Sequence, residues 1–250
     1  MSKIVEIDGV SLNYEIFGNG HEQVILLHGW GSSLENWRNF LDIASNSKFQ
    51  WIFLEMPGFG NSDDPSSPWN LDNYLDCVQK FITILNLSPK YLMAHSFGCR
   101  VSIKWLNTNH PFSKAVFVGA AGVPAKPSKF KSLLKKISPY FSSLFNKSPK
   151  LKEIFYRVIG SPDFNSLNPL MKQTFTNVIK EDLTPKLSKI SAPVLLVWGK
   201  HDTYTPIWMG KIMHSLIPNS KLVIYPNSRH GLHHTDPQKL ANDAINFFSE

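Results

Sequence analysis

Ser96 stands in a short pattern that could turn its hydroxyl into a nucleophile. The chain reads Ala94-His95-Ser96-Phe97-Gly98, with an apolar stretch before the serine and a helix-like stretch after it. A tight strand-to-helix turn exposes a serine hydroxyl, and such a turn needs small residues two positions before and after the serine. Ala94 and Gly98 meet this need, although glycine is the common first residue. The pattern is weak alone, so its weight depends on the rest of the chain.

An aspartate and a histidine follow the serine, each just beyond a stretch with the composition of a buried strand. Asp202 comes after the apolar run Pro193–Trp198, and His230 comes after the run Lys221–Tyr225. The carboxyl ends of strands are where open α/β sheets bind ligands. A histidine can take the proton of a serine hydroxyl, and a carboxylate can hold that histidine in the required tautomer. The order Ser96, Asp202, His230 therefore predicts nucleophilic acyl transfer.

A glycine-rich segment follows an earlier buried strand. The apolar run Val24–Leu27 opens into the His-Gly-Trp-Gly segment His28–Gly31. A loop of this kind exposes backbone N–H groups, which can stabilise a developing oxyanion. The glycines do not form the G-x-G-x-x-G pattern of dinucleotide sites, and we expect no cofactor.

With these segments in place, the chain resembles the α/β-hydrolase fold superfamily over nearly its whole length. The segments that carry the resemblance are His28–Gly31, Pro57–Ser62, the turn around Ser96, Gly199–Asp202 and Ser228–His230. The resemblance implies an α/β fold with a mostly parallel central sheet flanked by helices, and a helical cap inserted after the sixth strand. The family's order of nucleophile, acid and base is met. One departure is Glu55, where relatives usually carry aspartate, and we expect it to affect loop packing only.

The resemblance also implies roles for single residues. Ser96 would attack the substrate, His230 would act as the general base, and Asp202 would orient the imidazole. The backbone N–H groups of Trp30 and Phe97 would form the oxyanion hole. The further residues expected at the substrate pocket are His28, Gly29 and His95.

Each assignment has a structural alternative. Ser96 could be an ordinary serine of a non-catalytic relative, and Asp202 could cap the helical run that follows it. His230 has competitors in His233 and His234, three and four residues further on. The histidines beside the glycine-rich loop and beside the serine could orient backbone rather than react.

A long insertion separates two of the strands. About seventy residues lie between the strand-like run Ala115–Val118 and the next clear strand at Pro193, too many for a simple crossover. The insertion contains apolar residues at helical spacing, which are Phe130, Leu133, Leu134, Ile137, Tyr140 and Phe141. We predict that residues 121–187 form a helical cap over Ser96, and that residues 1–120 and 188–250 form one core domain.

The net charge of +7 is concentrated in that insertion. Residues 126–157 contain nine basic side chains and one acidic side chain. This segment therefore accounts for about the whole excess of positive charge. A local excess does not indicate nucleic acid as a partner. We interpret the lysines as the solvated outer face of the cap. Attraction of anionic substrates, or contact with an anionic membrane surface, remain as alternatives.

The remaining composition limits the class of protein further. The chain has 250 residues, no apolar stretch near the ~20 needed to cross a bilayer, and no leader-like start. Its two cysteines, Cys77 and Cys99, lie in predicted helices and form no disulfide framework, so we expect a reducing cytoplasm. The histidines near position 230 lack acidic or cysteine partners, and we expect no metal site. The oligomeric state is left open between a monomer and a homodimer.

These observations favour a serine hydrolase that cleaves small carboxylic esters through an acyl-enzyme intermediate. A serine at position 96 excludes the haloalkane dehalogenases and epoxide hydrolases of this fold, which use an aspartate nucleophile. Hydrolases of carbon–carbon bonds in meta-cleavage products share the expected features and are the main alternative. A slow-turnover ligand receptor with the same fold is a third reading. In each case the expected partner is a small molecule, an ester or a related acyl compound.

Overall fold

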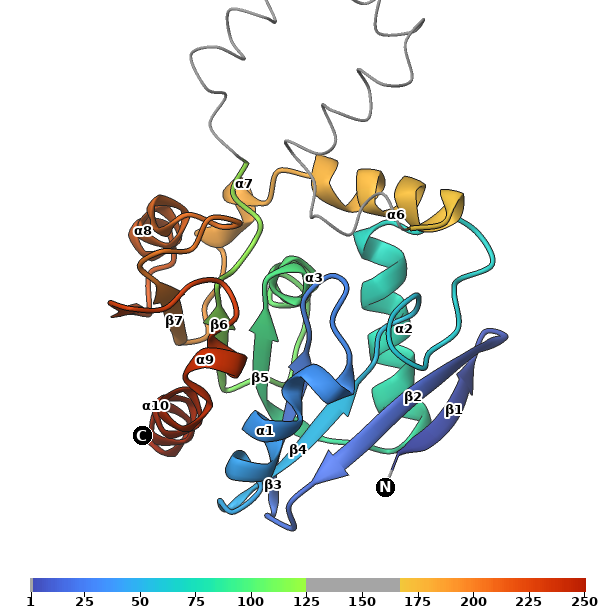
Figure 1. Cartoon of the computed structure of the whole chain (residues 1–250), viewed down its shortest axis with the longest axis horizontal. Coiled ribbons are helices and arrows are strands. Elements are labelled where there is room, and N and C mark those ends of the chain that lie inside the picture. Colours follow the sequence, from blue (N-terminus) through green and yellow to red (C-terminus); the bar gives the residue numbers. More distant parts are fainter. Residues whose placement is uncertain (1, 125–166) are drawn as a thin grey trace, which may run out of the picture.

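The strands form one eight-stranded sheet in a computed structural model that describes residues 2–124 and 167–250 (Figure 1). The strands are β1 (Lys3–Ile7), β2 (Val10–Phe17), β3 (Glu22–Leu27), β4 (Phe49–Leu54), β5 (Pro89–His95), β6 (Lys114–Val118), β7 (Val194–Gly199) and β8 (Ser220–Tyr225). Their spatial order is β1-β2-β4-β3-β5-β6-β7-β8. Only β2 runs antiparallel to its neighbours within this described sheet, and the other pairs are parallel. The expected α/β architecture with a mostly parallel sheet is confirmed.

Helices cover both faces of the sheet. They are α1 (Leu34–Ala44), α2 (Leu71–Ile84), α3 (Phe97–Trp105), α6 (Pro169–Lys180), α7 (Thr184–Leu187), α8 (Ile207–Leu216), α9 (Leu232–Thr235) and α10 (Pro237–Ser249). Successive residues of a strand point to opposite faces, so each face has its own core. Ile25 and Leu27 of β3 belong to the core with α2, α3, α7 and α8, whereas Val24 and Leu26 belong to the core with α1, α9 and α10.

The start of α6 is held against the segment that leads into α2. Asn168 caps α6 by accepting a hydrogen bond from the Met171 N–H at 2.9 Å, and Pro169 occupies the first turn, where its missing N–H costs nothing. Thr174 of α6 is fully buried and its hydroxyl accepts the Trp69 N–H at 3.0 Å. These contacts hold α6 above α2 and α3, as Figure 1 shows.

The described part of the predicted cap consists of its two ends. Residues 121–124 and 167–187, with α6 and α7, are described, whereas the apolar set between Phe130 and Phe141 and the basic stretch 126–157 lie outside the described residues. Cys77 and Cys99 are buried and unbonded, on α2 and α3. Of the helices described, none is long and apolar enough to cross a membrane.

Candidate active site

Ser96 lies in the one-residue turn between β5 and α3. Its backbone has φ 48° and ψ −108°, in the left-handed region that non-glycine residues rarely occupy. The turn is held by hydrogen bonds on both sides, from the Ser96 N–H to the Val118 carbonyl and from the Gly98 N–H to the His28 carbonyl, both 3.0 Å. Neighbouring strands thus impose a strained conformation, as often occurs at functional sites.

Gly98 is required by the close approach of α3 to β3. A Cβ atom at position 98 would lie 2.2 Å from the Leu27 carbonyl oxygen, which is backbone and cannot move aside. We therefore expect Gly98→Ala to lower the free energy of unfolding by about 3 kcal/mol or more, because it overpacks the turn. Urea denaturation measures this loss. Gly231→Ala is the matched control, since its added Cβ would meet only a His234 ring atom at 3.5 Å. Equal stability of the two variants would contradict this account of the turn.

Asp202 and His230 are 28 residues apart in sequence and form a direct pair. The His230 Nδ1 lies 2.7 Å from the Asp202 Oδ2, and the Asp202 side chain is fully buried. The other carboxylate oxygen accepts the backbone N–H groups of Tyr204 and Thr205, both at 2.9 Å. A carboxylate accepts from Nδ1–H, so the pair leaves the His230 Nε2 as the acceptor nitrogen.

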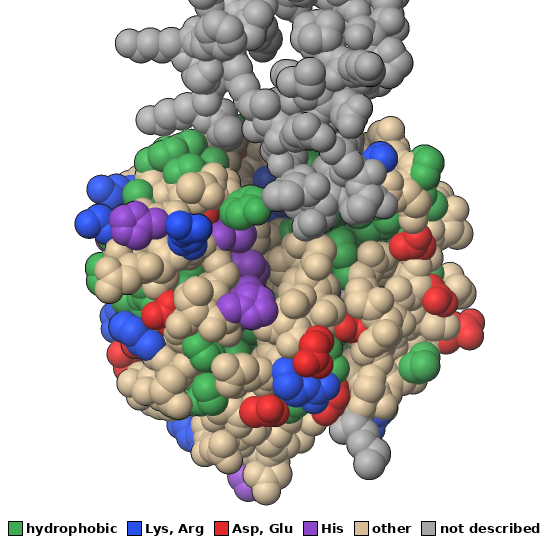
Figure 2. Space-filling model, in the orientation of Figure 1, with side chains coloured by type: hydrophobic (Ala, Val, Ile, Leu, Met, Phe, Trp, Pro, Cys, Tyr) green, Lys and Arg blue, Asp and Glu red, His purple; other side chains and the backbone are tan. Residues whose placement is uncertain are grey.

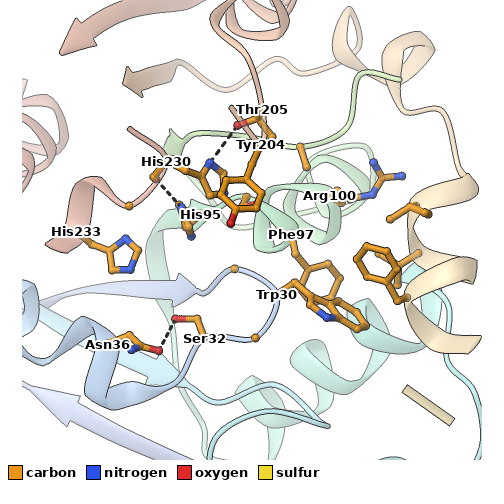
Figure 3. A pocket seen from close by; sticks show the side chains of 18 of the residues that line it. Trp30, Ser32, Asn36, His95, Phe97, Arg100, Tyr204, Thr205, His230 and His233 are labelled. Atoms are coloured by element: carbon orange, nitrogen blue, oxygen red, sulfur yellow. Dashed lines mark hydrogen bonds between the residues drawn. The ribbon is translucent and has the colours of Figure 1, made fainter. Parts of the chain in front are cut away.

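Ser96 and His230 line the same cavity, which has a volume of about 440 Å³. Figure 3 shows His230 and His95 on one side of this cavity and Trp30 and Phe97 on another. Within the described residues, no hydrogen bond joins the Ser96 hydroxyl to the His230 ring. Such bonds are often long without substrate and tighten when it binds.

The two N–H groups expected to form an oxyanion hole donate no backbone hydrogen bond within the described residues. Among the described residues, no backbone carbonyl accepts the N–H of Trp30 or of Phe97. The Phe97 N–H opens α3, where the helix dipole places partial positive charge. Both residues line the cavity that contains Ser96.

His28 lies beneath the glycine-rich loop, whereas Gly29 and His95 line the cavity. His28 is fully buried and is not among the described lining residues. Its Nε2 accepts the Met56 N–H at 2.9 Å, so its Nδ1–H donates to the Gly29 carbonyl at 2.7 Å. Burial lowers the pKa of His28 to about 4. A neutral His28 thus joins the loop to the end of β4.

Glu55 ties the same loop to two other segments. It is 1% exposed, and its carboxylate accepts the Leu34 N–H at 2.6 Å, the Asn61 N–H at 2.7 Å and the Asn13 amide at 2.8 Å. Leu34 begins α1 directly after the glycine-rich loop. The contacts agree with the expected packing role, and they connect it to the loop that carries Trp30.

Histidine rings lie next to one another beside His230. Figure 2 shows histidine side chains gathered on this face of the molecule. The His95 Nε2–H donates to the His230 carbonyl at 3.1 Å, and the His233 ring stacks on Trp37 with centroids 4.1 Å apart. The Nδ1 atoms of His95 and His233 are buried without a hydrogen-bond partner in the described structure. Burial holds the pKa of His95 well below its usual range and lowers that of His233 to about 3.

Acid should destabilise the fold through these buried histidines. Between a folded pKa of about 3 for His233 or about 4 for His28 and the ordinary value of 6.5, the unfolded chain binds more protons than the native state. Stability is therefore complete above pH 6.5 and falls as the pH is lowered, by about 1.4 kcal/mol per pH unit for each histidine. Urea midpoints from about pH 7.5 to about pH 5 measure the slope.

The variant His233→Phe keeps a flat ring against Trp37 and removes one titrating group, so its stability should depend less on pH. The exposed His21 provides the control His21→Gln, whose slope should match the wild type. An unchanged slope in His233→Phe would show that His233 makes no contribution.

Three residues near the site were not anticipated from sequence. The Thr205 hydroxyl lies 2.9 Å from the Asp202 Oδ2 and 3.0 Å from the Gly119 carbonyl. Tyr204 lies over His230, with ring centroids 5.1 Å apart. Arg100 lines the cavity from α3. For Arg100 a signal existed, since it is a basic residue one helical turn after Ser96.

The matching family model identifies the class of this protein. The model described as "alpha/beta hydrolase fold" matches residues 23–153, and a second one, described as "TAP-like protein", matches residues 174–248. The first match covers more than half of the chain, and the sheet order and turn geometry agree with it. The chain belongs to the α/β hydrolase family.

Individual relatives are distant but span the chain. It is 26% identical to the bifunctional esterase/perhydrolase DCH of Acinetobacter calcoaceticus, with 99% of each chain covered. It is 25% identical to a 2-hydroxy-6-oxononadienedioate/2-hydroxy-6-oxononatrienedioate hydrolase of Pseudomonas putida, covering 90% of this chain and 86% of that one. Among solved structures, a bromoperoxidase from Bacillus anthracis superposes with a TM-score of 0.79 at 22% identity, with 100% of both chains covered. The last similarity concerns the fold alone.

Proposed function

We propose that this protein is a serine hydrolase that cleaves small carboxylic esters, with Ser96 as nucleophile, His230 as base and Asp202 as the residue that orients the base. The observation that carries the proposal is the meeting of two features in one cavity. One is the strained serine turn, with φ 48°. The other is the hydrogen bond of 2.7 Å between the His230 Nδ1 and the buried Asp202 carboxylate. Each alone has structural explanations, but together they provide a nucleophile and its base.

The proposed reaction begins with attack of the Ser96 oxygen on the ester carbonyl. The His230 Nε2 takes the hydroxyl proton, while Asp202 holds the Nδ1–H and stabilises the imidazolium. The N–H groups of Trp30 and Phe97 bind the tetrahedral oxyanion, each worth roughly 10²–10³ in rate. His230 then protonates the leaving alcohol. In the second half, it activates the water that hydrolyses the acyl-enzyme.

The cavity walls suit a small substrate with an apolar portion. Trp30, Phe97 and Phe175 form an aromatic wall, with Trp30 ring centroids 5.3 Å from Phe97 and 4.9 Å from Phe175. Val178 and Ile179 of α6 complete it. We propose that α6 is the described edge of a cap formed by residues 121–187, and that the cap restricts acyl chain length.

Carbon–carbon bond hydrolysis is the second candidate. It is favoured by the 25% identity to the Pseudomonas putida hydrolase over most of both chains. The same serine, histidine and oxyanion donors would serve that reaction. The fold and the relatives favour an enzyme over the third reading, a slow-turnover receptor, which would bind ligand tightly with little product.

Hydrolysis of p-nitrophenyl esters from acetate to laurate tests the proposal. We expect turnover that peaks at short chains, because the cavity is about 440 Å³. A folded protein that hydrolyses none of these esters would contradict the ester proposal. A vinylogous diketone would then be the next substrate to assay.

A further inference from the structure

Arg100 is a charged side chain in the cavity that the proposed reaction does not use. It lies on α3 four residues after Ser96, which is one helical turn or about 6 Å along the helix axis. The residue is 7% exposed and lines the cavity. Figure 3 shows it on the α6 side, beyond Phe97 and opposite His233. It is therefore placed to contact the part of a substrate distant from the reacting carbonyl.

The Arg100 guanidinium forms no ion pair with any described residue. A guanidinium has five N–H donors, and one of the Arg100 donors binds the backbone carbonyl of Glu181. The Nε atom is buried with no acceptor in the described structure. The Glu181 carboxylate is instead held by Lys104, at 3.0 Å, and Lys104 also pairs with Asp72 at 2.6 Å. Glu181 and Asp182 are the two described acidic side chains whose charges act on Arg100. The Glu181 carboxylate is thus paired with a different cation, and the Asp182 carboxylate accepts the Thr184 N–H at 2.9 Å.

A buried cation with no ion pair among the described residues is costly and calls for an anion. Burial lowers the pKa of Arg100 to about 10, so the side chain stays protonated at neutral pH. A buried charge is usually compensated by a partner or by hydrogen bonds. The described residues that line the cavity include no aspartate or glutamate. A negatively charged ligand group would supply the missing partner.

We propose that Arg100 binds a carboxylate of the substrate, so that the cavity selects half-esters of short dicarboxylic acids. The ester carbonyl would lie at Ser96 and the free carboxylate at the guanidinium, whose planar donors match the two carboxylate oxygens. The aromatic wall formed by Trp30 and Phe97 would contact the methylenes between them. The inference rests on the proposed ester hydrolysis, and it adds the substrate class.

Two esters of equal shape and different charge test this inference. Monomethyl adipate carries the carboxylate, and methyl 6-methylheptanoate carries an isopropyl group in its place. The ratio of their kcat/KM values, measured by acid release at constant pH, should favour the anion by roughly 10- to 100-fold in the wild type. In Arg100→Met the ratio should fall to about one. Lys90→Met, which removes an exposed cation on β5 that pairs with Glu22 and lies outside the cavity lining, should keep the wild-type ratio.

Equal kcat/KM values for the two esters in the wild type would overturn the inference. So would a preference for the anion that survives in Arg100→Met. Thermal unfolding of each variant establishes that it is folded. If Arg100→Met does not fold, Arg100→Lys replaces it. Lysine keeps the charge without the planar donors, so Arg100→Lys should reduce the preference for the anionic ester.

Binding separates this inference from the proposed reaction. Calorimetric titration of Ser96→Ala, which should not turn over, is expected to show tighter binding of monomethyl adipate than of the uncharged ester. The difference should disappear when Arg100→Met is added. This binding preference without any wild-type ester turnover would support the Arg100 site and contradict the ester proposal. Ester turnover by the wild type without a binding preference in Ser96→Ala would support the ester proposal and contradict the Arg100 site.

Discussion

Replacement of Ser96 by alanine is expected to lower kcat for ester hydrolysis by roughly 10⁴- to 10⁶-fold, because the nucleophile is removed and only binding and oxyanion stabilisation remain. The cavity and the Asp202–His230 pair do not depend on the hydroxyl, since no described residue hydrogen bonds to it. The variant should therefore fold and unfold like the wild type. Initial rates on p-nitrophenyl acetate, with active protein confirmed by thermal unfolding, provide the measurement.

Ser102→Ala is a matched control for this experiment. Ser102 lies on the same helix, and its hydroxyl donates to the Gly98 carbonyl at 2.8 Å. It is fully buried and outside the described cavity lining. Its loss should cost about 1 kcal/mol of stability and leave kcat within a few-fold of the wild type. If Ser96→Ala retained comparable activity, the assignment of the nucleophile would be wrong.

Asp202→Asn should produce the second largest effect, a fall in kcat of about 10⁴-fold with little change in KM. The asparagine oxygen would keep the bonds from the Tyr204 and Thr205 N–H groups, both 2.9 Å in the native protein. Its amide N–H₂ would then face the His230 Nδ1. The ring would have to carry its proton on Nε2, where it cannot accept the serine proton.

Steady-state kinetics on one ester separate kcat from KM for this variant. Asp243→Asn is the control, because Asp243 is a half-buried carboxylate that accepts the Tyr225 hydroxyl at 2.7 Å away from the cavity. A fall of less than tenfold in Asp202→Asn would indicate that Asp202 acts as a structural cap of the following turn. The two N–H bonds to its Oδ1 show that this capping contact exists alongside the contact with His230.

The geometry of the serine turn could be predicted from local sequence. Small residues at 94 and 98 are needed only where a strand meets a helix closely, and the clash distance of 2.2 Å at Gly98 shows the physical basis. The apolar runs before His28, Ser96 and Asp202 likewise predicted buried parallel strands, whereas the strand before His230, β8, lies at the edge of the sheet with only Tyr225 buried. Such signals are local because a buried strand must be apolar along its length.

The pairing of distant residues depended on the tertiary structure. Asp202 and His230 meet because β7 and β8 pair in parallel with Gly199 opposite Tyr225, a register that no local pattern encodes. His28 shows the reverse case, since its sequence position suggests the cavity whereas packing turns its ring beneath the loop. Arg100 became informative only when Lys104 was found to hold the Glu181 carboxylate. Composition and spacing determine which elements form and which chemical groups they carry, whereas long-range packing decides which groups are paired and which are left for a ligand.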